Sequence, residues 1–375
     1  MNVYKKITCK QKILYLIVII SCLASIIFIY NNHSLYDDPI AKVVETNIEE
    51  LTEVTDVHQN EDQLFTQHIK AELKNGKEKG KIIHLTNEYS SSGAYDQKYK
   101  VGHELFVWFD KEIEEQSQLT GSIDDVKRDK YTLFVTWIFI FTLLIIGKKQ
   151  GFFSIISLAV NAVLLYYALD IYVKNPGSSL VLISGITVVL FTVTSLLLVN
   201  GRNEKTYAAI ITTLLGTFSA LLITYIVMVL TSESGLRYEA MDFLTRPYRV
   251  VFMAGLLVGS LGAVMDVAIT MSSSIFELYE NDNNIRNKAL KRSGLDIGKD
   301  IMGTMTSILF FAYVSGSIPM IILYLKNASA LNFALNLNLS LELARALAGG
   351  IGIVLTIPIG LYISIFFVNR KRAKQ

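Results

Sequence analysis

Eight long apolar segments constrain the fold of this chain more than any other feature of its sequence. A helix needs roughly 20 mostly apolar residues to cross about 30 Å of hydrocarbon, and each segment is close to that length. Charged residues are nearly absent inside the segments, because a charge facing lipid is costly. We therefore predict a membrane all-α bundle of eight transmembrane helices: 13–30, 131–147, 152–172, 178–199, 207–230, 250–275, 301–325 and 346–368.

The basic residues predict how this bundle is oriented. Alternate connections, together with the two chain ends, hold 17 Lys and Arg, whereas the other short connections hold only 6. The richer side faces the cytoplasm by the positive-inside rule. We therefore expect a multi-pass protein of a bacterial inner membrane, with both termini cytoplasmic and residues 31–130 extracytoplasmic.

Residues 31–130 form an acidic domain with the pattern of β-structure. They contain 21 Asp and Glu against 12 Lys and Arg, so we expect no nucleic-acid partner, because phosphates would be repelled. Residues 65–73 alternate between apolar and polar side chains, which predicts a half-buried strand, and Asn75-Gly76 predicts a turn. With further strands over 81–87 and 104–109, a small barrel or sandwich is expected, preceded by a polar, loosely ordered stretch over 36–60.

The domain organisation follows from these two patterns. We expect a cytoplasmic start and first helix over 1–30, the acidic β-rich domain over 31–130, and a seven-helix membrane domain over 131–375.

The cysteines allow no disulfide in the acidic domain, since Cys9 and Cys22 both precede it. The run that ends at Cys22 resembles a bacterial lipoprotein cleavage site, so lipidation there is an alternative to an uncleaved first helix. The chain stays apolar over 23–30, which favours the uncleaved helix.

Motifs for soluble catalysis or cofactor binding are missing. The sequence has no H-E-x-x-H, G-x-S-x-G, paired C-x-x-C or Walker loop, so we expect no enzyme and no cofactor. The glycines and lysines of 76–81 lack the Walker spacing and predict a solvated hairpin turn. A metal site built from His68, His84 and His103 is the alternative to plain strand-face histidines, and the latter is favoured.

Asp266 is the most informative polar residue, because it lies within the sixth apolar segment. It shares one helical face with three small residues, Gly255, Gly259 and Gly262, which predict close packing against another helix. The seventh segment places hydroxyl groups at matching depth: Thr304, Thr306 and Ser307. An acid among hydroxyls can load and release a proton or hold Na⁺; the alternative is a permanently protonated Asp that links two helices.

The last two apolar segments carry further features. Pro319 and Pro358 remove helix hydrogen bonds and predict bends. Alternation over 331–341 predicts an extended outer loop. Ser340, near the end of that loop, would cap the final helix.

Three strings resemble the YibE/F-like family of bacterial multi-pass membrane proteins. They are Gly259-Ser260-Leu261-Gly262-Ala263-Val264-Met265-Asp266-Val267-Ala268, Asp300-Ile301-Met302-Gly303-Thr304-Met305-Thr306 and Gly350-Ile351-Gly352-Ile353-Val354-Leu355-Thr356-Ile357-Pro358. The domain over 31–130 is similar to that of the YibE branch. Ser307 departs from the family, which often has Asn there. The resemblance implies a membrane protein and leaves its activity open.

The order of one span, an outer domain and further spans is also similar to SecD and SecF, relatives of the resistance-nodulation-division transporters that run on proton flow. This likeness concerns layout alone. We therefore expect an ion-coupled (proton) transporter or export component of unknown substrate, with Asp266 as the coupling group. The alternatives are a membrane scaffold or assembly factor that acts through its outer domain, and a channel. Expected partners are the lipid bilayer and a sister subunit or a second copy of the chain.

Overall fold

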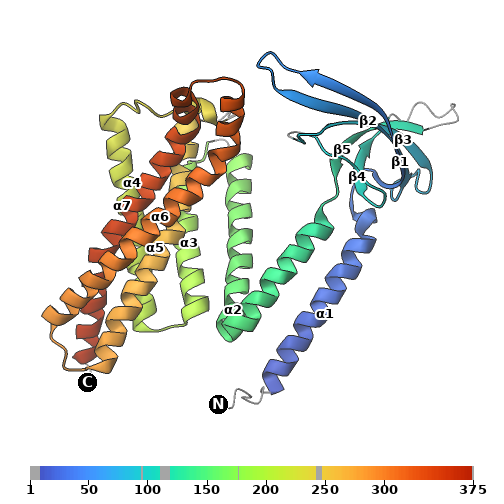
Figure 1. Cartoon of the computed structure of the whole chain (residues 1–375). Helices are drawn as coiled ribbons and strands as arrows, with labels where there is room; N and C mark the ends of the chain where they lie inside the picture. Colours follow the sequence, from blue (N-terminus) through green and yellow to red (C-terminus); the bar gives the residue numbers. More distant parts are fainter. Residues whose placement is uncertain (1–8, 94–95, 110–118, 176, 242–246, 374–375) are drawn as a thin grey trace, which may run out of the picture. The chain divides into compact units, whose positions relative to one another are not determined.

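The computed structural model describes residues 9–93, 96–109, 119–175, 177–241 and 247–373. The chain divides into two compact units, Met1–Thr142 and Leu143–Gln375. The first unit contains a β-barrel, the first membrane helix and the beginning of the second, and the second unit is helical (Figure 1). The predicted combination of a helical bundle with a small β-domain is confirmed.

Five strands close the barrel of the first unit in the order β1-β2-β3-β5-β4. β3 and β5 pair in parallel, and the other neighbours are antiparallel. This order is that of the five-stranded Greek-key barrel called the OB-fold. The strands are β1 (Ile40–Thr55), β2 (Glu61–Leu73), β3 (Ile82–Ser90), β4 (Glu104–Trp108) and β5 (Leu119–Val126).

The barrel interior is filled by the alternate side chains that the sequence pattern places inward. Ile69, Ala71 and Leu73 of β2 are fully buried or nearly so, so the strand predicted over 65–73 is confirmed. The expectation of loose order over 36–60 is wrong, because β1 pairs with β2 along its whole length and buries its own first residues. β4 pairs only with the first residues of β1, so the rest of β1 pairs with β2 alone. Most side chains there are exposed to water, which agrees with the mostly polar sequence of this part.

Seven helices among the described residues are long and apolar enough to cross a membrane, one fewer than the eight predicted. They are α1 (Cys9–Asn31), α2 (Asp129–Lys174), α3 (Leu180–Asn200), α4 (Glu204–Leu230), α5 (Tyr248–Asn281), α6 (Asn287–Lys326) and α7 (Leu331–Arg372). Short 3-10 turns, η1 (Asn32–Leu35) and η2 (Tyr238–Ala240), follow α1 and α4.

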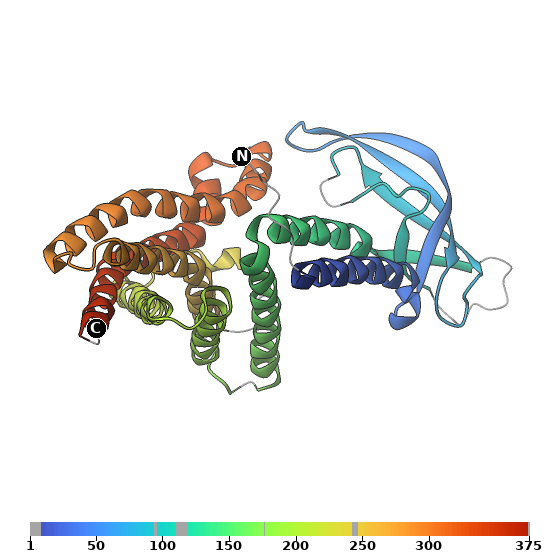
Figure 2. The same cartoon turned by 90° about the horizontal axis from the view of Figure 1, so that it is seen from below.

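The difference in number arises in α2, which contains both 131–147 and 152–172. Its backbone leaves the helical conformation at Lys148, with φ 48° and ψ −119°. The chain folds back there so tightly that a Cβ on Gly151 would overlap the Leu143 carbonyl. The first part of α2 lies beside α1 (Figures 1 and 2), and Trp137 donates a hydrogen bond from Nε1 to Ser25 Oγ at 2.9 Å.

α5 lies at the centre of the second unit, where α3, α4, α6 and α7 contact it. α7 begins at Leu331, so the outer loop predicted over 331–341 is wrong. Ala334 and Leu341 are buried seven residues apart, which is the spacing of one helical face. Ser340 is therefore inside the helix, and its hydroxyl accepts the Arg237 N–H at 3.0 Å instead of capping. Helices α6 and α7 continue through Pro319 and Pro358.

Candidate functional site

The two sides of α5 differ sharply in their surroundings. One side is buried against neighbouring helices through large apolar residues that include Phe252, Leu257 and Met271. The other side carries Asp266, whose side chain is exposed on the surface of the bundle. Asp266 is the only charged residue of the sequence between Val250 and Phe276.

The predicted glycine face of α5 is only partly packed. A Cβ on Gly259 would overlap the Tyr313 hydroxyl of α6, so this glycine does allow close approach. Gly255 and Gly262 have nothing within 4 Å of a built Cβ. Asp266 therefore lies on a stretch of helix surface that the described residues of this chain leave largely uncovered.

The structure does not bring the predicted hydroxyl groups to Asp266. The Thr304 hydroxyl donates to the Ile301 carbonyl at 2.9 Å, and the Ser307 hydroxyl donates to the Gly303 carbonyl at 2.9 Å. Thr306 instead turns its methyl group toward Gly350 of α7.

Asp266 consequently has a bare carboxyl group. Its backbone carbonyl accepts a hydrogen bond from the Thr270 hydroxyl at 2.8 Å, but no described side chain bonds or pairs with the carboxyl oxygens. An ionised group on a helix centre costs about 2.5–3.5 kcal/mol on membrane-insertion scales when it faces lipid. This carboxyl group therefore needs water, a proton or a group from another chain.

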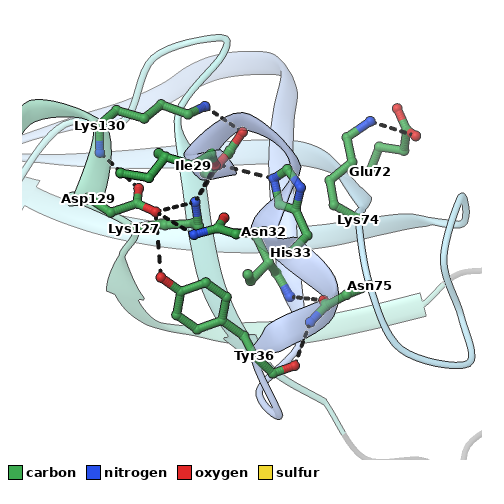
Figure 3. Close-up of polar contacts among 12 residues, drawn as sticks. Ile29, Asn32, His33, Tyr36, Glu72, Lys74, Asn75, Lys127, Asp129 and Lys130 are labelled. Atoms are coloured by element: carbon green, nitrogen blue, oxygen red, sulfur yellow. Dashed lines mark hydrogen bonds and ion pairs between the residues drawn. The ribbon is translucent and has the colours of Figure 1, made fainter. Parts of the chain in front are cut away.

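A second polar centre lies in the first unit, where the barrel meets the ends of α1 and α2 (Figure 3). Glu104 of β4 is its middle, with a side chain only 5% exposed. Its carboxylate pairs with Lys130 Nζ at 2.6 Å, with His33 Nε2 at 3.2 Å and with Lys127 Nζ at 3.4 Å. Two separate chain segments, the one after α1 and the one at the start of α2, therefore converge on one buried acid of β4.

We call Glu104 and the polar residues around it the junction cluster. Lys127 extends this cluster to Asp129 at the start of α2. Its Nζ, with a side chain 1% exposed, lies 2.6 Å from Asp129 Oδ2 and 3.4 Å from the Ile29 carbonyl of α1. Asn32 Nδ2 donates to the same carboxylate at 3.2 Å, and the Tyr36 hydroxyl lies 3.5 Å from it. The cluster thus connects both helix ends to the barrel.

Opposing effects set the pKa of Glu104. Burial alone would raise this pKa, but the hydrogen bond and charge of Lys130, helped by His33, outweigh burial and lower it. Glu104 is therefore ionised at neutral pH. Buried Lys127, held between two carboxylates, satisfies the rule that buried charges are paired.

The histidines do not assemble as a metal site. His68 pairs with Glu49 at 3.1 Å and lines a shallow groove of about 330 Å³ together with His84. His103 Nδ1 accepts the Lys100 N–H at 3.4 Å. Among the residues whose positions are described, no three His, Cys, Asp or Glu could hold a metal ion together.

Two family models match the chain, and together they match parts of both units. The model described as YibE/F-like protein matches residues 135–370, and the one described as YibE/F family N-terminal domain matches residues 34–126. This chain belongs to the YibE/F-like family. The N-terminal match of this YibE/F-like protein spans the whole barrel from β1 to β5, and the other covers α3 to α6 entirely. No curated protein and no solved structure matches the chain.

Proposed function

We propose that this YibE/F-like membrane protein is an ion-coupled transporter or export component in which Asp266 takes up and releases a proton. The observation that carries the proposal is a single carboxyl group within an apolar helix, exposed and without a partner among the described residues. We place the protein in a bacterial inner membrane, with both termini in the cytoplasm and the barrel outside.

The main alternative role for Asp266 is a static one. A permanently protonated Asp that ties two helices together makes a hydrogen bond across the helix interface. Asp266 makes no such bond to any described residue, and the hydroxyls of Thr304 and Ser307 donate to carbonyls of their own helix. A carboxyl group without a fixed partner is free to change its protonation state, which is what coupling to a proton gradient requires.

The surroundings of Asp266 during transport follow from the cost of exposing it to lipid. Exposing an ionised carboxyl group to lipid costs about 2.5–3.5 kcal/mol. We therefore expect the face around Gly255, Gly262 and Asp266 either to line a water-filled path or to contact another subunit. A proton could then reach the carboxyl group along that face.

Proton flux in liposomes tests this proposal. The full chain is reconstituted with a pH-sensitive dye inside the vesicles, and flux is measured for the wild type and Asp266→Asn. The matched control is Glu277→Gln, an exposed acid eleven residues along the same helix but beyond its apolar part. We expect Asp266→Asn to abolish flux, Asp266→Glu to retain part of it, and Glu277→Gln to retain it fully. Equal flux through wild type and Asp266→Asn would refute the coupling role.

A scaffold or assembly role is the second candidate, and the projecting part of the β1–β2 hairpin favours it. Residues 44–64 contain seven Asp and Glu and no Lys or Arg. Several apolar side chains are exposed there, including Ile48, Leu51 and Val57. Such a surface suits a basic partner protein.

Shortening this hairpin separates the two candidate functions. Residues 52–64 are replaced by a two-residue Asn-Gly turn, which joins the paired residues Leu51 and Phe65 and keeps the paired base of β1 and β2. A scaffold loses its cellular function with this change and tolerates Asp266→Asn, whereas a transporter shows the reverse pattern.

A further inference from the structure

The loop between β2 and β3 has a charge opposite to that of the domain around it. Residues 74–81 hold four lysines and a single acid, Glu78, although residues 31–130 as a whole carry 21 acidic against 12 basic residues. We call residues 74–81 the lysine loop. Its sequence has glycines and lysines but not the Walker spacing, so its basic character needs another explanation.

The lysine loop is fixed beside the end of α1. Asn75, only 7% exposed, donates from Nδ2 to the carbonyls of Tyr36 at 3.1 Å and Asp38 at 2.9 Å. Its Oδ1 accepts the Ile40 N–H at 2.6 Å. Figure 3 shows this contact beside the junction cluster. The loop is therefore held against the segment that leaves the membrane helix.

The strand register places acidic and basic residues at opposite ends of the hairpin. Ala41 pairs with Leu73 at the end next to α1, and Thr55 pairs with Glu61 at the far end. The lysine loop follows Leu73 directly, whereas the acidic residues of 44–64 extend toward the far end. Positive charge thus gathers at the end of the domain that adjoins the membrane helix.

Two lysines of the loop are available to bind an anion. Lys74 pairs with Glu72 at 2.7 Å, and Lys81 pairs with Glu78. Lys77 and Lys79 are exposed, and neither pairs with a carboxylate among the described residues.

A hollow of about 520 Å³ lies between the lysine loop and the end of α1. Lys79, Lys74 and Asn75 line it from the loop, and Asn31, His33 and Ser34 line it from the helix end and η1. Asp37 adds one carboxylate to the lining. The lining thus combines two lysines with several hydrogen-bonding side chains, which is chemistry that can hold a phosphate group.

Large apolar side chains lie exposed on the chain that borders this hollow. Ile27 of α1 is 64% exposed and Leu35 of η1 is 67% exposed. At the end of a membrane helix, such side chains contact lipid. A molecule with a phosphate in the hollow could therefore place apolar chains along α1.

We infer that this hollow binds the phosphate-bearing headgroup of an anionic phospholipid, with its acyl chains against α1. A dissolved anion is disfavoured as occupant, because the domain has an excess of nine negative charges that repels it. A lipid arrives within the membrane plane and gains apolar contact as well. The inference does not depend on proton coupling through Asp266.

Lipid retention by the full chain tests this inference. The purified protein is exchanged into nanodiscs of equal phosphatidylglycerol and phosphatidylcholine, extracted in mild detergent, and analysed by native mass spectrometry for bound lipid. The test variant is K77Q/K79Q, which changes only exposed, unpaired lysines, and the control is K70Q/K98Q, with the same charge change elsewhere on the barrel. Thermal unfolding checks that each variant is folded.

We expect the wild type and K70Q/K98Q to retain phosphatidylglycerol in preference to phosphatidylcholine. K77Q/K79Q should lose this preference by about fivefold per lysine, the value for one basic side chain at an anionic membrane surface. The single variant K79E should lose it as well. Equal loss in both double variants, or no preference in the wild type, overturns the inference.

A competition arm separates a lipid from free phosphate. Millimolar inorganic phosphate and glycerol phosphate are added before the mass measurement. Retained phosphatidylglycerol supports the lipid as ligand. Its complete displacement by inorganic phosphate, with phosphate bound in its place, overturns the lipid assignment.

Discussion

Replacing Glu104 by Gln should loosen the barrel from the ends of its two membrane helices. Glu104 is the one acid that Lys130, His33 and Lys127 share, and the Lys127 side chain is only 1% exposed. The amide of Gln keeps the volume but removes the negative charge, which leaves Lys127 with Asp129 as its only carboxylate partner. The excess positive charge then lies in a place that water barely reaches.

The size of the effect follows from how buried each partner is. Removing one member of a buried ion pair costs about 3–5 kcal/mol. Lys130 and His33 are 24% and 17% exposed and can regain some hydration, so we expect about 3 kcal/mol, the lower end of that range. The control is Glu45→Gln, which breaks the exposed pair with Lys70 and should cost less than about 1 kcal/mol.

Denaturant unfolding of the full chain in detergent measures this difference. The chain has two tryptophans, so a Trp137→Phe background leaves Trp108 of β4 as the fluorescent reporter of the barrel. We expect the midpoint for Glu104→Gln to fall well below that of Glu45→Gln. Matching midpoints for the two variants would refute the idea that the junction cluster stabilises the barrel.

The same assay has a pH dependence with a defined sign. The pKa of Glu104 is lower in the folded chain than its ordinary value of 4.5. Its contribution to stability is therefore fully present above about pH 4.5 and is lost as the pH falls through the folded pKa. In Glu104→Gln the stability of the barrel should fall less steeply as the pH is lowered below about 4.5. An equally steep fall in wild type and variant would contradict a stabilising role for ionised Glu104.

Two further changes test packing and buried polar contacts. Gly151→Ala should destabilise the second unit by about 1–3 kcal/mol, because its Cβ would overlap the Leu143 carbonyl, while Gly147→Ala in the same helix has open space and should be neutral in thermal unfolding. Gln67→Leu should destabilise the barrel by about 1–3 kcal/mol in the Trp108 assay, because the fully buried Gln67 donates to the Tyr99 carbonyl at 2.7 Å and accepts the Tyr99 N–H at 3.2 Å. An unchanged unfolding midpoint would refute the respective argument.

The membrane class and the β-domain could be predicted because each depends on local periodicity. Apolar length marks a membrane helix wherever it occurs, and alternation over 65–73 marks a strand with one buried side. The number of helices differs by one from the prediction because α2 includes two apolar segments on either side of the sharp reversal at Lys148. Residues 331–341 are helical and not extended, because a leucine-rich stretch fits either the helical or the strand period.

The junction cluster was not predicted, because its members are distant along the chain. Asn32 and Asp129 are 97 residues apart, and nothing in the local sequence of either indicates the other. The only hint is that charged residues directly follow or precede an apolar segment. The structure shows no hydrogen bond between Asp266 and the predicted hydroxyl groups for a related reason. Equal depth along two helices does not determine which way each helix is rotated.

The long separation within the junction cluster has a consequence for how the protein is made. The barrel strands lie between these residues in the chain, so the barrel must close before Lys127, Asp129 and Lys130 can reach Asn32, His33 and Glu104. Closure of the barrel and the pairing of the ends of α1 and α2 therefore become one event during folding. A chain whose barrel misfolds would therefore leave the ends of α1 and α2 without the contacts that hold them to the barrel.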